Sequence, residues 1–128
     1  PHAHGIPFAP ALTVAGDYSF PSGREAARRL PGGAARPTAI FAGNDDMAAG
    51  ALAVAHEVGI GVPDELSIAG FDDSDLAAAV WPPLTTIRQP VRELAWAAAD
   101  LLLSEDRKRD RLTLDYDLVL RASTGAAR

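Results

Sequence analysis

The chain has 128 residues, enough for one domain with a buried core, and it lacks the run of ~20 apolar residues needed to cross a membrane. Its net charge is −5, and acids interrupt its one dense basic stretch, Arg107–Arg111, which argues against nucleic-acid binding by this chain alone. Cysteine is absent, which excludes disulfides and thiolate chemistry and fits a cytoplasmic protein.

The first part of the chain predicts an irregular start, a strand and a helix. Pro1–Pro10 is expected to be irregular, and the apolar run Ala11–Ala15 is expected to be a strand. Ser22 and Glu25 match a capping box, in which two side chains bond to the first backbone N–H groups of a helix. A helix is therefore expected over Gly23–Leu30.

The rest of the chain repeats the strand-and-helix pattern. Further strands are expected at Thr38–Ala42, Leu66–Gly70 and Leu84–Ile87. Helices are expected at Asp45–Val58, Ser74–Val80 and Pro90–Ser104, where apolar side chains recur at helical spacing. The tail Leu112–Leu120 alternates apolar and polar residues, which predicts a half-exposed edge strand or a strand for another subdomain.

Strands that alternate with helices predict an α/β fold with a parallel sheet flanked by helices, because the chain must cross over before each new strand. In such a sheet the carboxyl ends of the strands share one edge, here called the rim, and ligands bind beside it. A polar side chain follows each expected strand: Asp17, Asn44, Asp72 and Gln89. The sequence therefore predicts a small-molecule site made of hydrogen-bonding groups.

Two of these residues carry the strongest expectation of ligand binding. The carboxylate of Asp72 can accept two hydrogen bonds from neighbouring hydroxyls of one ligand, as in a sugar, whereas Asp73 is expected to cap the next helix. Asn44 is also a preferred helix cap. Asp45 could cap in its place, and the Asn44 amide would then be free to bind a ligand.

The other rim positions have open alternatives. Asp17 could bind ligand or only shape a turn, and Gln89 could bind ligand or be a solvated residue before a proline. Tyr18 could stack on a sugar face or a flat ligand, or it could be an aromatic residue at the edge of the core.

No motif for catalysis, a metal or a cofactor is present. The GxSxG elbow, a phosphate-binding glycine loop and HExxH are missing, and no histidine has a second ligand at metal spacing. A phosphoryl-accepting site would require a basic residue at a strand end. The only lysine, Lys108, follows the last expected helix, which argues against such a site. We expect a non-enzymatic chain with no cofactor and no metal, and a flavodoxin-like enzyme is the weaker alternative.

Four motifs together resemble the effector-binding domain of the lactose/galactose-repressor (LacI/GalR) family of transcription regulators: NDDMAAGAL, GVPDELSIAGFDD, P-LTTIRQP and a closing R-A-S-T. The resemblance runs from GDYSFPSG to Thr124 and implies one lobe of a two-lobed, periplasmic-binding-protein-like type I fold. Residues 1–128 would be a part of the C-terminal subdomain. The other lobe and an N-terminal helix-turn-helix DNA-binding domain would lie outside the chain.

The resemblance also implies roles for individual residues. In that family the positions matching Asn44 and Asp72 bind the effector, and the position matching Tyr18 lines the cleft. The position matching Gln89 lies at the crossover between the lobes.

The family resemblance further implies a homodimer, with an interface at Ala49, Val80 and Trp81. The expected function is the sensing of an effector, which is a sugar or a similar small molecule. The whole protein is expected to be a cytoplasmic transcription regulator that acts as a repressor. DNA would be contacted only through the missing domain, and no membrane is expected as a partner. A sugar-binding protein of a transporter, which shares the fold, is the alternative.

Overall fold

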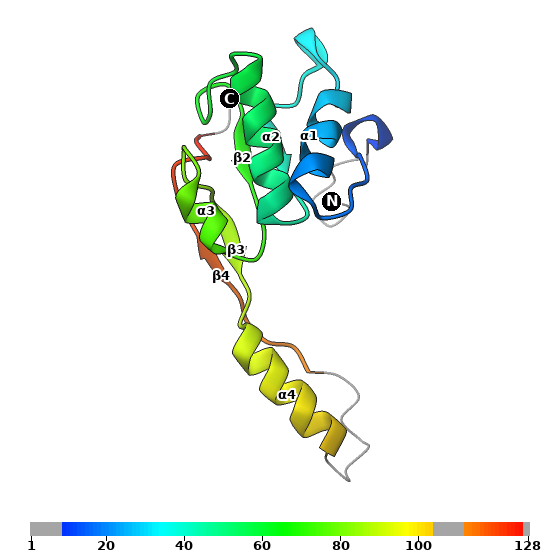
Figure 1. Ribbon diagram of the computed structural model, residues 1–128, viewed down its shortest axis with the longest axis vertical. Helices are drawn as coiled ribbons and strands as arrows, with labels where there is room; N and C mark the ends of the chain where they lie inside the picture. Colours follow the sequence, from blue (N-terminus) through cyan, green and yellow to red (C-terminus); the bar gives the residue numbers. More distant parts are fainter. Residues whose placement is uncertain (1–8, 104–111, 127–128) are drawn as a thin grey trace.

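The computed structural model describes residues 9–103 and 112–126, so most of Pro1–Pro10 and the basic stretch Arg107–Arg111 lie outside the described residues. Figure 1 shows the elements in chain order. They are η2 (Pro10–Leu12), α1 (Phe20–Arg29), η3 (Gly33–Ala35), β1 (Ala39–Phe41), α2 (Asp45–Glu57), β2 (Ser67–Ala69), α3 (Asp75–Ala79), β3 (Thr86–Arg88), α4 (Val91–Leu103) and β4 (Asp117–Val119). No helix in these ranges is long and apolar enough to cross a membrane.

The strands form two short sheets joined by one bridge. β1 and β2 are parallel, with Ile40 opposite Ile68, and β3 and β4 are antiparallel, with Ile87 opposite Leu118. A single parallel bridge between Ala69 and Thr85 joins the sheets, so β1, β2 and β3 run in the same direction. The predicted α/β fold with parallel strands and crossover helices is confirmed.

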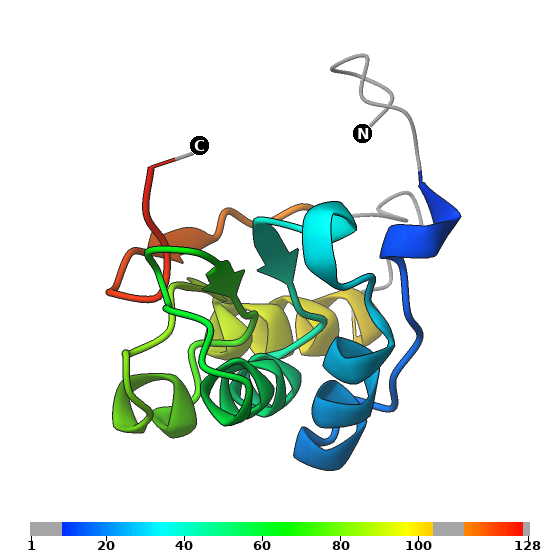
Figure 2. The same cartoon turned by 90° about the horizontal axis from the view of Figure 1, so that it is seen from above.

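The core lies between the strands and the helices that cover one of their faces. Figure 2 shows α1, α2 and α3 on the same side of the strands. Ala48 of α2 packs with Ile68 of β2 and Leu84, and none of the three has exposed surface. A Cβ atom at Gly50 would lie 2.3 Å from the carbonyl oxygen of Phe20, so α2 can approach α1 this closely only because position 50 has no side chain.

The predicted strand Ala11–Ala15 is wrong. The structure places the 3₁₀ turn η2 at its start, where the N–H of Leu12 bonds to the carbonyl of Ala9 and the N–H of Thr13 to that of Pro10. Pro10 fixes the backbone dihedral that suits the first position of such a turn. An apolar run also needs a neighbouring strand to become a strand itself, and none of the described strands pairs with this run.

The first helix begins earlier than predicted. Ser19 is its N-cap and accepts a hydrogen bond from the N–H of Ser22, so α1 starts at Phe20 instead of Gly23. The capping box of Ser22 and Glu25 is therefore wrong, because Ser22 already lies in the first turn. The helices α2, α3 and α4 match the predicted ranges within a residue or two.

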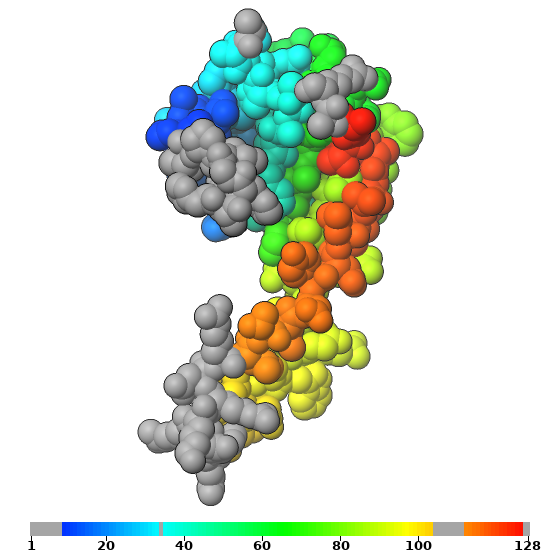
Figure 3. Space-filling view, turned by 180° about the vertical axis from the view of Figure 1, so that it is seen from behind, coloured from blue at the N-terminus to red at the C-terminus, as the bar shows by residue number. Residues whose placement is uncertain are grey.

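The part of the chain around α4 extends away from the core as an arm, defined here as residues 90–103 and 112–116 (Figure 1). No described side chain of α4 is buried, and Trp96 is 73% exposed. The predicted tail strand is confirmed only over Asp117–Val119, where β4 is an edge strand against β3. Figure 3 shows residues 112–126 as a continuous strip that returns from the arm to the core.

Candidate functional site

Backbone hydrogen bonds bring the ends of β1, β2 and β3 together at one edge. The N–H of Asp45 donates to the carbonyl of Phe71 at 3.0 Å, and the N–H of Asp72 donates to the carbonyl of Ile87 at 2.8 Å. The residues that follow the three strands are therefore held side by side. They include Asn44, Asp72 and Gln89, three of the four residues of the predicted rim. Asp17 does not follow a strand, because Ala11–Ala15 does not form one.

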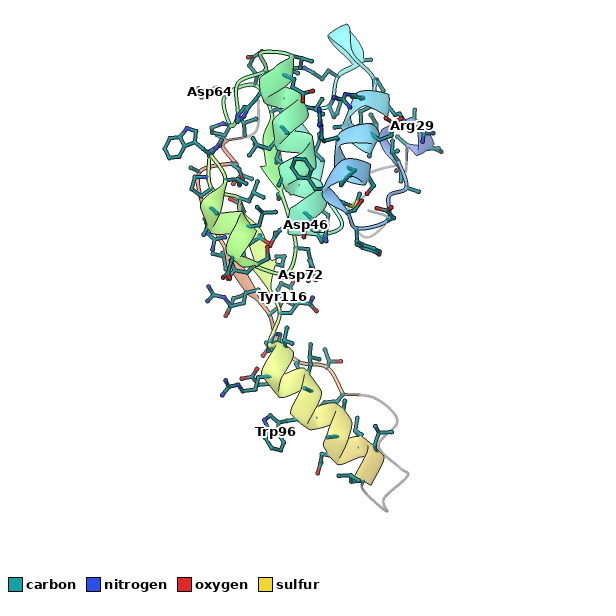
Figure 4. All side chains as sticks on the ribbon, in the orientation of Figure 1. Arg29, Asp46, Asp64, Asp72, Trp96 and Tyr116 are labelled. Atoms are coloured by element: carbon teal, nitrogen blue, oxygen red, sulfur yellow. The ribbon has the colours of Figure 1, made fainter. Side chains whose placement is uncertain are left out.

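Asp72 is bound directly to Gln89. The Nε2 atom of Gln89 donates to Oδ1 of Asp72 at 2.6 Å, and the Asp72 residue is exposed. Gln89 also lines a hollow of about 350 Å³ that Tyr116 and Arg92 border from the arm. Figure 4 shows Asp72 and Tyr116 near the junction between core and arm. A carboxylate with one oxygen held in place keeps acceptor capacity for ligand hydroxyls.

Asn44 caps α2 and reaches the segment before α1. Its Oδ1 accepts from the N–H of Met47 at 2.9 Å, and its Nδ2 donates to the carbonyl of Tyr18 at 2.9 Å. The expectation that Asp45 would cap in its place and free the amide is wrong. An amide has two donor hydrogens and two acceptor lone pairs, so one of each remains for a ligand.

Asp45 lies beneath the rim instead. Its side chain is buried, with the residue 1% exposed, and it accepts from the N–H of Ser74 at 2.7 Å and the hydroxyl of Thr86 at 2.6 Å. A Cβ atom at Gly70 would lie 2.3 Å from Oδ1 of Asp45, so this carboxylate fits only against a glycine. Asp45 thus links the start of α2 to the loop after β2 and to β3.

Asp17 is used by its own turn. Its Oδ1 accepts from the N–H of Ser19 at 3.0 Å and from the Ser19 hydroxyl at 2.6 Å. Hydrogen bonds from the Ser19 and Ser22 hydroxyls lower the pKa of Asp17 to about 2. The neighbouring Tyr18 has a positive φ of 67° and is exposed, so its ring is available to a ligand. Asp17 thus shapes this turn, and its binding of a ligand stays a prediction.

Asp73 does not cap α3, contrary to expectation. The N-cap is Ser74, without a side-chain cap bond, and the carboxylate of Asp73 bonds to Arg88 and Arg121, each at 2.6 Å. Burial alone would raise the pKa of Asp73, but the hydrogen bonds and charges of Arg121 and Arg88 outweigh it and hold the pKa below the ordinary 3.8. Asp73 therefore stays ionised beside the exposed Asp72.

A family model described as the periplasmic binding protein-like domain matches residues 2–124 of the chain. The chain belongs to this family. The HTH-type transcriptional repressor CytR of Escherichia coli is 41% identical over 127 residues, which cover 95% of this chain and 37% of CytR. The ribose operon repressor of E. coli is 39% identical over 99 residues, covering 77% of this chain and 30% of the repressor.

Solved structures give the same result. The transcriptional regulator CelR in complex with cellobiose has a TM-score of 0.81 at 34% identity, covering 95% of this chain and 38% of CelR. A LacI-family regulatory protein from Chloroflexus aggregans has a TM-score of 0.83 at 31% identity. The match covers 97% of this chain and 46% of that protein. The motif-based assignment to the LacI/GalR regulators is thus confirmed. The chain spans less than half the length of each of these relatives.

The three residues expected at a dimer interface differ in how much of their surface is exposed. Ala49 on α2 is 3% exposed, so its side chain packs into the core and offers no surface to a partner. Val80 is partly buried against the core cluster, whereas Trp81 is 78% exposed. Of the three, only Trp81 presents a large free apolar surface.

The closing R-A-S-T motif of the family has a structural explanation that the sequence did not reveal. Ser123 is fully buried; its hydroxyl donates to the carbonyl of Ile68 at 2.6 Å and accepts from the N–H of Thr85 at 2.8 Å. Arg121 donates to the carbonyl of Leu84 at 2.9 Å as well as to Asp73. Through these hydrogen bonds, the motif holds the segment that follows β4 against both sheets.

Proposed function

We propose that this chain is the effector-sensing part of a transcriptional repressor, and that its effector is a sugar or a similar polyhydroxylated small molecule. The observation that carries the proposal is the exposed carboxylate of Asp72, which Gln89 holds at the end of β2 beside Asn44. The names of the relatives support it, since CytR and the ribose operon repressor are repressors and the CelR structure is a cellobiose complex.

The chemistry of the rim suits hydroxyl groups. Asp72 can accept two hydrogen bonds from adjacent hydroxyls, and the remaining amide hydrogen and lone pair of Asn44 can each serve a further hydroxyl. The exposed ring of Tyr18 adds an apolar face for the C–H side of a sugar ring. Asp17, bonded within its own turn, would contribute by shaping the backbone under Tyr18.

The rim forms one wall of the proposed binding cleft. A ligand seated on it would remain open to water on its other side, and closure by a second lobe would remove that water and preorganise the contacts. Differential affinity for the open and closed arrangements would then bias the DNA-binding part of the whole protein. In this proposal the chain is non-enzymatic, works without a cofactor in the cytoplasm, and contacts DNA only through a separate domain.

Self-association is a further part of the proposal. In the whole protein, the exposed Trp81 at the end of α3, beside the partly buried Val80, would contribute apolar surface to a homodimer. The relatives reported above are transcriptional regulators, which supports effector sensing in a regulator over the two alternatives, a transport protein and an enzyme.

The test uses the full-length gene product, with D-ribose and cellobiose as probes. Thermal stabilisation identifies a sugar that binds, and calorimetry then gives its affinity. We expect Asp72→Asn to weaken binding by about 1.5–3 kcal/mol, the range for hydrogen bonds to charged groups. The control is Asp75→Asn, which changes a nearby exposed acid on α3 and should keep native affinity. Native affinity in the Asp72 variant would contradict the assignment of the rim.

A further inference from the structure

The loop that carries Asp72 has a backbone shape that needs support. Asp72 and Asp73 both have positive φ angles, 105° and 54°, a region that is uncommon for residues other than glycine and that aspartate and asparagine enter more readily than most. Such a conformation persists only where the surroundings fix it. The side chain of Asp73 is 7% exposed, so it points into the protein and not toward solvent.

Contacts from two separate segments fix this loop. The carboxylate of Asp73 bonds to Arg88 on β3 through Oδ2 and to Arg121, just after β4, through Oδ1, both at 2.6 Å. The N–H of Asp73 donates to the hydroxyl of Thr86 on β3 at 3.3 Å. Arg121 is itself held, because it also donates to the carbonyl of Leu84.

We infer that Asp73 is a positioning residue, which joins the Asp72 loop to both β3 and β4 so that the loop and the two strands move as one unit. β3 leads into the arm and β4 returns from it (Figure 1). A contact made at Asp72 would therefore change the position of the strands that carry the arm. This last consequence rests on the proposed function, whereas the joining of the loop to the strands does not.

The test is amide hydrogen exchange by NMR on this chain, without a ligand. Asp73→Asn is the decisive variant, because asparagine tolerates a positive φ and keeps an acceptor oxygen but loses the charge. We expect the amides of Asp72 and Arg121 to exchange about 10- to 100-fold faster, the range for lost hydrogen bonds between charged groups. The amide of Ala42, which bonds to Ala69 between β1 and β2, should change far less.

Two further variants test the pairing itself. Arg121→Met, which removes the less exposed arginine, should reproduce the faster exchange, and Arg88→Met should do so more weakly because Arg88 is more exposed to water. Combined with Asp73→Asn, Arg88→Met should add little, since its partner charge is already gone. Asp75→Asn is the control and should leave all three amides unchanged.

Two results would overturn the inference. If the amides of Asp72, Arg121 and Ala42 all accelerate by the same factor in Asp73→Asn, the residue only contributes to global stability. If none of them accelerates, the ion pairs do not hold the loop. Failure of every sugar to bind at the rim would count against the proposed function. It would not affect the inference about Asp73, which the exchange experiment tests without a ligand.

Discussion

Asp17 lies beside the rim, and its Oδ1 atom accepts two hydrogen bonds within its own turn. Hydrogen bonds from the serine hydroxyls lower its pKa from 3.8 to about 2. A depressed pKa means that the ionised form stabilises the folded chain above pH 3.8, and that this stabilisation is lost as the pH falls toward 2. Asp17→Asn should therefore lower the melting temperature at neutral pH.

The difference in melting temperature between the variant and the native chain should shrink as the pH falls toward and below 2, because the native carboxylate is then increasingly protonated. Circular dichroism melts across this pH range provide the measurement, with Asp100→Asn on the exposed α4 as a matched control. A constant difference between Asp17→Asn and the native chain at every pH would mean that the charge of Asp17 is not what stabilises the turn.

The candidate site was predictable from the sequence where its residues follow strands directly. Asn44, Asp72 and Gln89 could be placed together because parallel strands end at one edge. The partners of Asp73 could not be found this way, because Arg121 lies 48 positions further along the chain. Nothing local marks such a pair, and Asp73 matched the pattern of a helix cap equally well. The buried role of Asp45 was hidden for the same reason.

At the scale of elements, local sequence patterns predicted helices and strands correctly where a neighbouring element was present to pack or pair with them. α2 carries both an apolar stripe and a capping residue, and β1 and β2 pair with each other, so these ranges were predicted closely. The run Ala11–Ala15 has strand-like composition but no ladder partner among the described strands. Strand formation depends on neighbours more than helix formation does, which explains this failure.

The cap of α2 gives a prediction at this scale. Asn44→Ala removes the acceptor for the Met47 N–H and the donor to the Tyr18 carbonyl, so it should lower the free energy of unfolding by about 1–2 kcal/mol. Asn44→Ser keeps a capping acceptor and loses the donor to Tyr18 without adding a charge, so its loss should be smaller. Urea unfolding of this chain measures both. Equal losses would show that the bond to Tyr18, and not the helix cap, stabilises this end of α2.

At the scale of the whole molecule, the core and the arm differ in how much surface they bury. The core packs α1 and α2 against the strands, whereas the arm leaves large apolar side chains in water, among them Trp96, Leu102 and Tyr116. A helix of this length is marginal in water without tertiary packing. Exposed apolar surface on this scale favours association with whatever complementary surface is available.

We therefore predict that this chain on its own forms dimers or larger species through the arm. Removing apolar side chains from water contributes roughly 25 cal/mol per Å², so two charges placed on that surface should oppose association strongly. Sedimentation velocity should show concentration-dependent association of the native chain and a shift to monomer for Trp96→Glu combined with Leu102→Glu. Trp81→Glu, which changes an equally exposed tryptophan on the core, should leave association through the arm intact. If instead Trp81→Glu alone gives monomers, the surface at the end of α3 holds the copies together and the arm does not.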